Sequence, residues 1–157
     1  MAVAKRAQGF DMSIAYCNRT PLADAPWHYQ PDLLTLAQQS DYLLLCTPGG
    51  ASTRHLINRP VLDALGKQGT LINISRGSVV DQQALIAALD EGTLGAAGLD
   101  VFDDEPRVPE ALQNRANVVI TPHIASATWS TRQAMSQRVL DNVRAYFAGH
   151  PLVTPIP

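Results

Sequence analysis

Five short apolar runs, each bounded by turn residues, constrain the fold of this chain more than any other feature of its sequence. The runs cover residues 12–17, 42–46, 70–74, 96–101 and 117–121. Their near-continuous apolar character is typical of strands covered on both faces, as in a parallel sheet. We therefore expect a parallel sheet at the centre of the fold.

Helical patterns lie between and around these runs. Residues 32–40 and 81–91 place leucines at helical spacing behind an aspartate that can cap a helix. A longer pattern over 126–148 carries an apolar stripe and stops at Gly149, so we expect it to pack against a large surface. Residues 1–9 have the pattern of the later part of a helix that ends at Gly9. Strands alternating with helices predict an α/β fold with a doubly wound parallel sheet.

The composition excludes several classes of protein. With 157 residues, 46% of them apolar and 17% charged, the chain has room for one domain with a hydrophobic core. The net charge of -2 leaves no basic patch for a nucleic acid. No apolar stretch reaches the roughly 20 residues that cross a membrane, and we expect a cytoplasmic protein. The histidines and cysteines lack metal-ligand spacing, so we expect no metal.

Three residues that suit carbonyl chemistry each follow a different predicted strand: Arg76, Glu105 and His123. An arginine grips a carboxylate through two parallel hydrogen bonds, an imidazole transfers a proton near neutral pH, and a carboxylate can hold that imidazole. Each residue alone has an ordinary explanation, as a surface ion pair, a solvated acid or a turn residue. Their combination at successive strand ends predicts a site for the reduction of a 2-keto acid.

Three motifs carry a resemblance to a known family. They are TPGGASTRHLIN, LINISRGSVVDQQALIAALDEGTLGAAGLDVFDDEP and NVVITPHIASAT. Together they resemble the nucleotide-binding domain of the D-isomer-specific 2-hydroxyacid dehydrogenases, and PGGASTRHLIN and DEPRVPEAL look most like the glyoxylate and hydroxypyruvate reductases. The resemblance implies an oxidoreductase with a Rossmann-type fold that reduces a small 2-keto acid with NADPH or NADH, as a homodimer.

The resemblance also implies a division of labour among the three charged residues. Arg76 would bind the substrate carboxylate and keto oxygen, and His123 would protonate the carbonyl oxygen. Glu105 would accept a hydrogen bond from the imidazole. A neighbouring carboxylate favours the imidazolium, so His123 could stay protonated near neutral pH. Arginine does not lose its proton, so Arg76 must act as a clamp.

Several residues match cofactor contacts of the family: Cys46, Thr47, Pro48, Thr53, Ile74, Ser75, Asp100, Ala125 and Ser126. Asp100 would face the nicotinamide carboxamide, and the loop that begins at Cys46 would lie beside the adenosine ribose. For Cys46, Pro48 and Ile74 the alternative is plain packing. Trp129 follows this last group and could close over a substrate pocket of its own subunit or of a neighbouring one; the alternative is packing, which an aromatic residue at a helix start more often serves.

The cofactor preference follows from the residues after the first predicted strand. An acidic residue there usually binds the adenosine 2′-hydroxyl of NADH, whereas an arginine accommodates the 2′-phosphate of NADPH. The strand is followed by Asn18, Arg19 and Thr20, without an acid. We therefore predict NADP in preference to NAD, with these three side chains around the phosphate; the alternative is an Arg19 that projects into solvent.

The glycine fingerprint GxGxxG of dinucleotide-binding folds is absent from this sequence. Relative to the family, Met1 falls just after it. We therefore expect residues 1–157 to form an incomplete dinucleotide-binding domain, the C-terminal portion of a longer enzyme, with 126–157 returning toward a substrate domain. Loss of the first strand would expose two long hydrophobic edges, and the chain alone should bind cofactor poorly and turn over little or nothing. The alternatives are a non-catalytic nucleotide-sensing protein of the same fold, or an inactive fragment.

Overall fold

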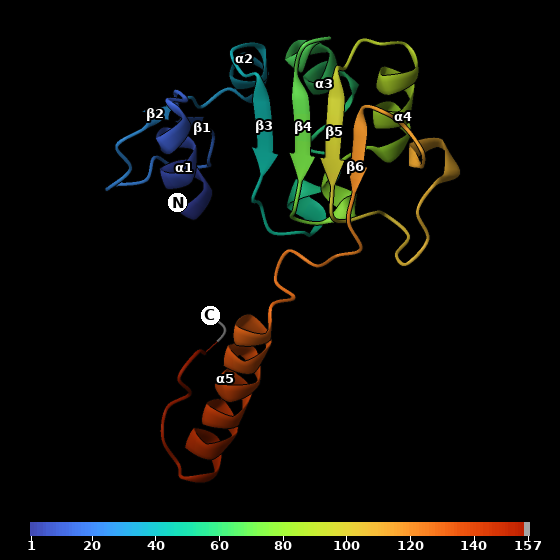
Figure 1. Cartoon of the computed structure of the whole chain (residues 1–157). Coiled ribbons are helices and arrows are strands. Elements are labelled where there is room, and N and C mark those ends of the chain that lie inside the picture. The colour runs from blue at the N-terminus through green and yellow to red at the C-terminus, as the bar shows by residue number, and fades with distance from the viewer. Residues whose placement is uncertain (156–157) are drawn as a thin grey trace. The chain divides into compact units, whose positions relative to one another are not determined.

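The computed structural model describes residues 1–155 and divides the chain into two units, one from Met1 to Ile120 and one from Thr121 onward. Each is described by itself. The first contains a parallel sheet in the order β3-β4-β5-β6 (Figure 1). Its strands are β3 (Tyr42–Leu45), β4 (Thr70–Asn73), β5 (Ala96–Leu99) and β6 (Val118–Ile120). The predicted α/β fold with parallel strands is confirmed.

Three helices of this unit pack in a row, with α2 (Leu33–Gln38) against α3 (Arg59–Leu65) and α3 against α4 (Gln82–Asp90). The side chain before each helix, an aspartate or an asparagine, accepts a hydrogen bond from a backbone N–H of the first turn. Helices and sheet enclose one core. Its most deeply buried apolar residues include Ile57, Leu62, Leu71, Leu85, Leu94 and Leu112.

A second, smaller parallel sheet pairs β1 (Ala15–Tyr16) with β2 (His28–Tyr29). The helix α1 (Ala2–Ala7) and a 3-10 turn, η1 (Gln8–Phe10), precede it. Within the described residues no bridge joins β1 to β3, so each keeps one unpaired edge. The strand β1 is only two residues long, so the edge expected at β1 is short, whereas β3 presents four residues at its unpaired edge.

Each predicted element has a counterpart in the structure, although the run 12–17 forms only the two-residue strand β1, and the structure adds one strand and one α-helix that the prediction lacks. The strand β2 lies between the predicted elements 12–17 and 32–40, where the sequence predicts none, because two residues are too few to show alternation. The helix α3 is only seven residues long. Its signals were present in the sequence, since Asn58 caps it and Pro60 stands in its first turn.

The second unit contains the longest helix, α5 (Trp129–Phe147), capped by Thr128. None of its residues is buried. Apolar side chains exposed along it include Met135, Val139, Val143, Tyr146 and Phe147. The surface against which we expect it to pack therefore stays a prediction, and the last two residues of the expected 126–157 segment lie outside the described residues. No helix in the described part of the chain combines the length and apolarity needed to cross a membrane.

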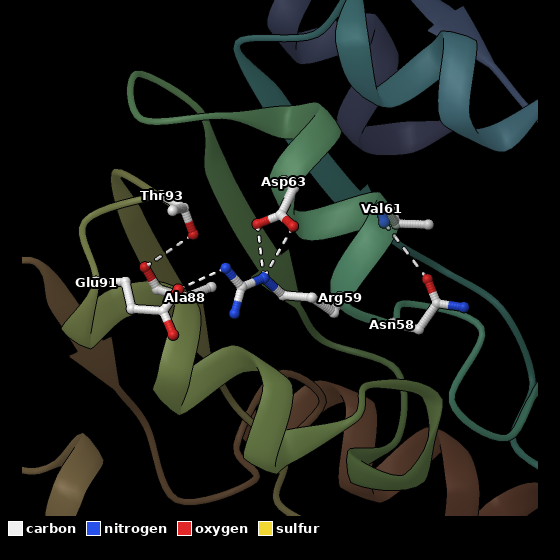
Figure 2. A network of polar contacts seen from close by, with 7 residues as sticks. All are labelled: Asn58, Arg59, Val61, Asp63, Ala88, Glu91 and Thr93. Atoms are coloured by element: carbon white, nitrogen blue, oxygen red, sulfur yellow. Dashed lines mark hydrogen bonds and ion pairs between the residues drawn. The ribbon is translucent and has the colours of Figure 1, made fainter.

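An ion-pair network joins α3 to the end of α4 (Figure 2). Arg59 Nε donates to both carboxylate oxygens of Asp63, at 2.7 and 2.8 Å, and its terminal nitrogen donates to Glu91 at 2.5 Å. These bonds, with Glu91 first and Asp63 second, raise the pKa of Arg59 well above its usual range. All three side chains are well exposed, so solvent screens these ion pairs and they contribute little to the packing of the two helices.

Candidate functional site

The predicted site residues of the first unit gather at the carboxyl ends of its strands. Cys46, Thr47 and Pro48 follow β3; Ile74, Ser75 and Arg76 follow β4; Asp100 follows β5 directly. Because the strands are parallel and in register, these ends form one edge of the sheet, here called the carboxyl edge (Figure 1). Ligands of open α/β sheets bind at this edge.

The turn after β4 is held by a buried amide. Asn73, the last residue of β4, accepts hydrogen bonds from the Ser75 N–H at 3.0 Å and from the Ser75 hydroxyl at 2.9 Å. Its own Nδ2 donates to the Arg76 carbonyl oxygen at 3.0 Å. Ser75 is buried, while Arg76 is exposed and donates from a terminal nitrogen to the Ser75 carbonyl oxygen. The turn thus presents Arg76 at the carboxyl edge.

Two glycines let this turn approach its neighbours. A Cβ on Gly49, in the loop after β3, would lie 2.8 Å from Cγ of Arg76. A Cβ on Gly77, the first residue of the 3-10 turn η3 (Gly77–Val79), would lie 2.0 Å from the carbonyl carbon and oxygen of Phe102. The loop that carries Arg76 is therefore packed against the loops that follow β3 and β5.

Glu105 lies in the turn that Gly77 contacts. One of its carboxylate oxygens accepts a hydrogen bond from the Phe102 N–H at 3.0 Å, so the side chain folds back over its own turn. Asp100, at the start of this segment, is buried, and its N–H donates to the Asn73 carbonyl oxygen at 3.0 Å. The structure thus brings together Arg76, Asp100 and the turn of Glu105.

The loop after β3 contributes an unpartnered polar atom. Thr47 Oγ1 is buried and has no hydrogen-bond partner. Thr53, at the end of the 3-10 turn η2 (Ala51–Thr53), closes the same loop, because its hydroxyl donates to the Pro48 carbonyl oxygen at 2.7 Å. A buried hydroxyl without a partner costs free energy, so a ligand that bonds Thr47 would remove that cost.

Asn18, Arg19 and Thr20 follow the carboxyl end of β1, and all three are exposed. The carbonyl oxygen of Asn18 accepts a hydrogen bond from the Tyr29 hydroxyl at 3.0 Å, which ties this segment to β2. Cys17 stands just before them; burial, with a smaller contribution from Asp32, raises the pKa of its thiol. The segment therefore offers one cation and two neutral polar side chains to solvent.

The second unit carries the remaining predicted residues: His123, Ala125, Ser126 and Trp129. His123 is exposed and has a left-handed backbone with φ of 53°, and its N–H donates to the Thr121 carbonyl oxygen at 3.1 Å. Trp129, the first residue of α5, is 92% exposed, so the structure describes no packing role for it. The bond expected between His123 and Glu105, and the place of Trp129 against a neighbouring subunit, stay predictions.

The sequence-based prediction missed two residues of this site, Asn73 and Gly77. Asn73 had a signal, since it is a polar residue inside an otherwise apolar run. A buried amide in that position must find hydrogen-bond partners, and the nearest lie in the turn that follows. Gly77 gave no signal by itself, because its importance comes from the Phe102 backbone, 25 residues further along the chain.

Comparisons with known proteins agree on one family. Residues 1–125 match the model of the family "D-isomer specific 2-hydroxyacid dehydrogenase, NAD binding domain". The chain is 50% identical over 155 residues to a glyoxylate/hydroxypyruvate reductase A of Arabidopsis thaliana, covering 99% of this chain and 50% of that relative. It is 47% identical over 156 residues to a hydroxyphenylpyruvate reductase of Plectranthus scutellarioides, with the same coverage. The chain spans about half the length of the curated relatives it matches.

Among solved structures, the chain resembles an NADPH-dependent glyoxylate/hydroxypyruvate reductase of Sinorhizobium meliloti in complex with NADP and malonate. The TM-score is 0.96 at 48% identity, covering 99% of this chain and 49% of the other. A 2-hydroxyacid dehydrogenase of Ketogulonicigenium vulgare gives a TM-score of 0.93 at 48% identity, with the same coverage.

Proposed function

Because the chain belongs to the D-isomer-specific 2-hydroxyacid dehydrogenases, whose NAD-binding domain it matches, we propose that it acts in the NADPH-dependent reduction of glyoxylate or hydroxypyruvate to the D-2-hydroxyacid. The family consists of NAD(P)-dependent oxidoreductases. The observation that carries the proposal is the placement of Arg76, on a turn locked by Asn73 and packed against the turn of Glu105.

In this proposal Arg76 binds the substrate. A 2-keto acid presents a carboxylate next to a carbonyl group, and a guanidinium can bond both. The exposed position of Arg76 at the carboxyl edge leaves its outer N–H groups available to a small anion. Arg76 would thus fix the carboxylate, turn the carbonyl carbon toward the cofactor side, and stabilise the negative charge that develops on the oxygen.

His123 is proposed as the general acid and Glu105 as the residue that orients it. When the carbonyl π bond breaks, the carbon gains a hydride and the oxygen gains a proton from the imidazolium. Glu105 would hold the imidazole and favour its protonated form. NADPH, when bound, supplies the hydride and leaves as NADP⁺.

The residues present fit part of a dinucleotide. Thr47 Oγ1 offers a buried polar atom without a partner at the carboxyl edge, and the loop that follows it approaches Arg76 with no side chain at Gly49. We propose, from the family resemblance, that the cofactor contacts are Cys46, Pro48, Thr53, Ile74, Ser75, Asp100, Ala125 and Ser126. Asn18, Arg19 and Thr20 would hold the 2′-phosphate.

The NADPH preference is expected to depend on Arg19. Arg19→Ala should weaken NADPH binding about 10-fold, the loss of one charge-assisted contact, and leave NADH binding nearly unchanged. Nucleotide fluorescence titrations of the chain measure both affinities. Arg6→Ala is the control, because Arg6 bonds the Ala2 carbonyl oxygen within α1. Equal affinities for the two nucleotides, unaltered by Arg19→Ala, would refute the preference.

The reaction itself is tested by NADPH oxidation with the chain in stoichiometric amount, so that slow turnover is detected. Glyoxylate or hydroxypyruvate should accelerate the loss of NADPH absorbance, and His123→Gln should remove that acceleration. If NADPH binds and no keto acid is reduced, the chain by itself binds a nucleotide without catalysis, which favours the non-catalytic alternative for this chain. The chain spans about half the length of the Arabidopsis thaliana relative, so the assay tells whether that half is sufficient for the reaction.

A further inference from the structure

One residue of the carboxyl edge stands out by its burial. Asn73 is 1% exposed at the end of β4, and its neighbours in the sheet register are Leu45 on β3 and Leu99 on β5, each 5% exposed. An apolar side chain would suit this position by packing alone. A buried amide there costs free energy unless its polar atoms are bonded, so the bonds that Asn73 makes determine what its presence achieves.

All of those bonds go to the turn that carries Arg76. The Oδ1 atom accepts from the Ser75 N–H and from the Ser75 hydroxyl, and the Nδ2 atom donates to the Arg76 carbonyl oxygen. A single rigid amide therefore fixes the backbone on both sides of the peptide group that joins Ser75 to Arg76. The Arg76 carbonyl oxygen also accepts from the Val79 N–H at 3.2 Å, which extends the constraint into η3.

The constraint reaches the guanidinium through two further contacts. A terminal nitrogen of Arg76 donates to the Ser75 carbonyl oxygen at 2.6 Å, within the segment that Asn73 holds. The aliphatic stem of Arg76 lies close against Gly49, where an added Cβ would meet Cγ at 2.8 Å. An exposed arginine side chain usually samples many rotamers. The Arg76 side chain instead bonds a turn whose backbone is held by the hydrogen bonds of Asn73.

We propose that Asn73 is the positioning residue for Arg76. Its buried amide holds the Ser75–Arg76 turn so that the guanidinium faces the carboxyl edge in one orientation. The functional part of this inference rests on the proposed role of Arg76 in binding a keto-acid carboxylate; the positioning itself is a property of the ligand-free chain. Asn73 touches no substrate in this scheme, because its bonds go to the turn.

The test measures the order of the Arg76 side chain directly. The heteronuclear NOE at Arg76 Nε reports fast motion of that atom without any ligand. In the unsubstituted chain it should be close to backbone values, and in Asn73→Leu it should fall to the value of Arg138, an exposed arginine of α5. Leucine matches the side chains at the neighbouring register positions, so the fold is expected to persist. The thermal melt of each variant verifies this.

Two variants complete the design. Asn73→Asp keeps an acceptor for Ser75 and loses the donor to the Arg76 carbonyl oxygen, so it replaces Asn73→Leu if that variant does not fold. Asn117→Ala is the matched control, because Asn117 Nδ2 also donates to a loop carbonyl oxygen, that of Gly95 at 2.9 Å, near the opposite ends of the strands. It should leave the Arg76 signal unchanged. An Arg76 Nε that is mobile in the unsubstituted chain, or equally ordered in a folded Asn73 variant, overturns the proposal.

Oxalate, an unreactive dicarboxylate, separates this proposal from the proposed function. Asn73→Leu should raise its dissociation constant at least about 10-fold, which corresponds to about 1.4 kcal/mol, and Arg76→Gln should raise it at least as much. If Arg76→Gln has no effect or oxalate does not bind, the role of Arg76 in substrate binding fails, and the NOE still decides the positioning. If Asn73→Leu binds oxalate as tightly as the unsubstituted chain while Arg76→Gln binds it more weakly, the positioning proposal fails and the role of Arg76 in substrate binding stands.

Discussion

Gly77→Ala is expected to destabilise the first unit by about 3 kcal/mol or more, a large effect for the addition of one methyl group. The new Cβ would lie 2.0 Å from the carbonyl carbon and oxygen of Phe102 and 2.4 Å from the Asp103 nitrogen. These are backbone atoms, so a rotamer change cannot relieve the overlap. The loop after β4 would have to move away from the loop after β5. Urea unfolding of the chain, followed by circular dichroism, measures the change.

A matched glycine separates this clash from a general cost of replacing glycine. A Cβ on Gly98, inside β5, would meet only side-chain atoms of Ile72, at 3.8 and 3.9 Å, which is ordinary contact. The free energy of unfolding of Gly98→Ala should therefore lie within about 1 kcal/mol of that of the unsubstituted chain. If Gly77→Ala were as stable as Gly98→Ala, the loop after β4 would not pack against the loop after β5. Arg76 would then not lie near the turn of Glu105.

Arg76→Gln is expected to lower the second-order rate constant of glyoxylate reduction at least about 100-fold, the usual cost of removing a charged group that stabilises a developing oxyanion. Glutamine keeps hydrogen-bonding capacity but loses the charge. Arg76→Lys should recover only part of the loss, because an ammonium group cannot make two parallel bonds to a carboxylate. NADPH oxidation by stoichiometric amounts of the chain, over a range of glyoxylate concentrations, provides the comparison.

Arg107→Gln is the control for this loss. Arg107 lies two residues after Glu105 and forms an ion pair with Asp104. The Arg107 side chain is 82% exposed. Removing its charge changes the electrostatics near the site without touching the turn that carries Arg76. We expect a change of less than about twofold. If the two arginine variants lost activity equally, the effect would come from overall charge, and Arg76 would have no specific role.

The sequence alone supported the sheet and the ends of its strands. The runs 42–46 and 70–74 overlap β3 and β4 closely, because buried parallel strands produce continuous apolar stretches. Arg76 could be placed at the carboxyl edge for the same reason. Two residues of β2 between prolines, and seven of α3, were too short for their periodicity to be recognised.

The contacts that organise the site could not be predicted in the same way. The packing of Gly77 on Phe102 depends on the register of β4 and β5, which places two distant turns side by side. The unpartnered hydroxyl of Thr47 depends on how its loop closes through Thr53. Both are tertiary properties, and neither residue type indicates them. Asn73 is an intermediate case: the sequence shows a polar residue in an apolar run, but it does not show which groups that residue bonds.

The break between the two sheets has a consequence for how the chain behaves in solution. Unpaired N–H and C=O groups along β1 and β3 can template the addition of an extended segment from another molecule. A net charge of -2 provides little mutual repulsion between copies. We therefore expect the unpaired backbone groups of Tyr42–Leu45 and Ala15–Tyr16 to favour association at high concentration, and a proline or lysine placed on these strands to reduce it.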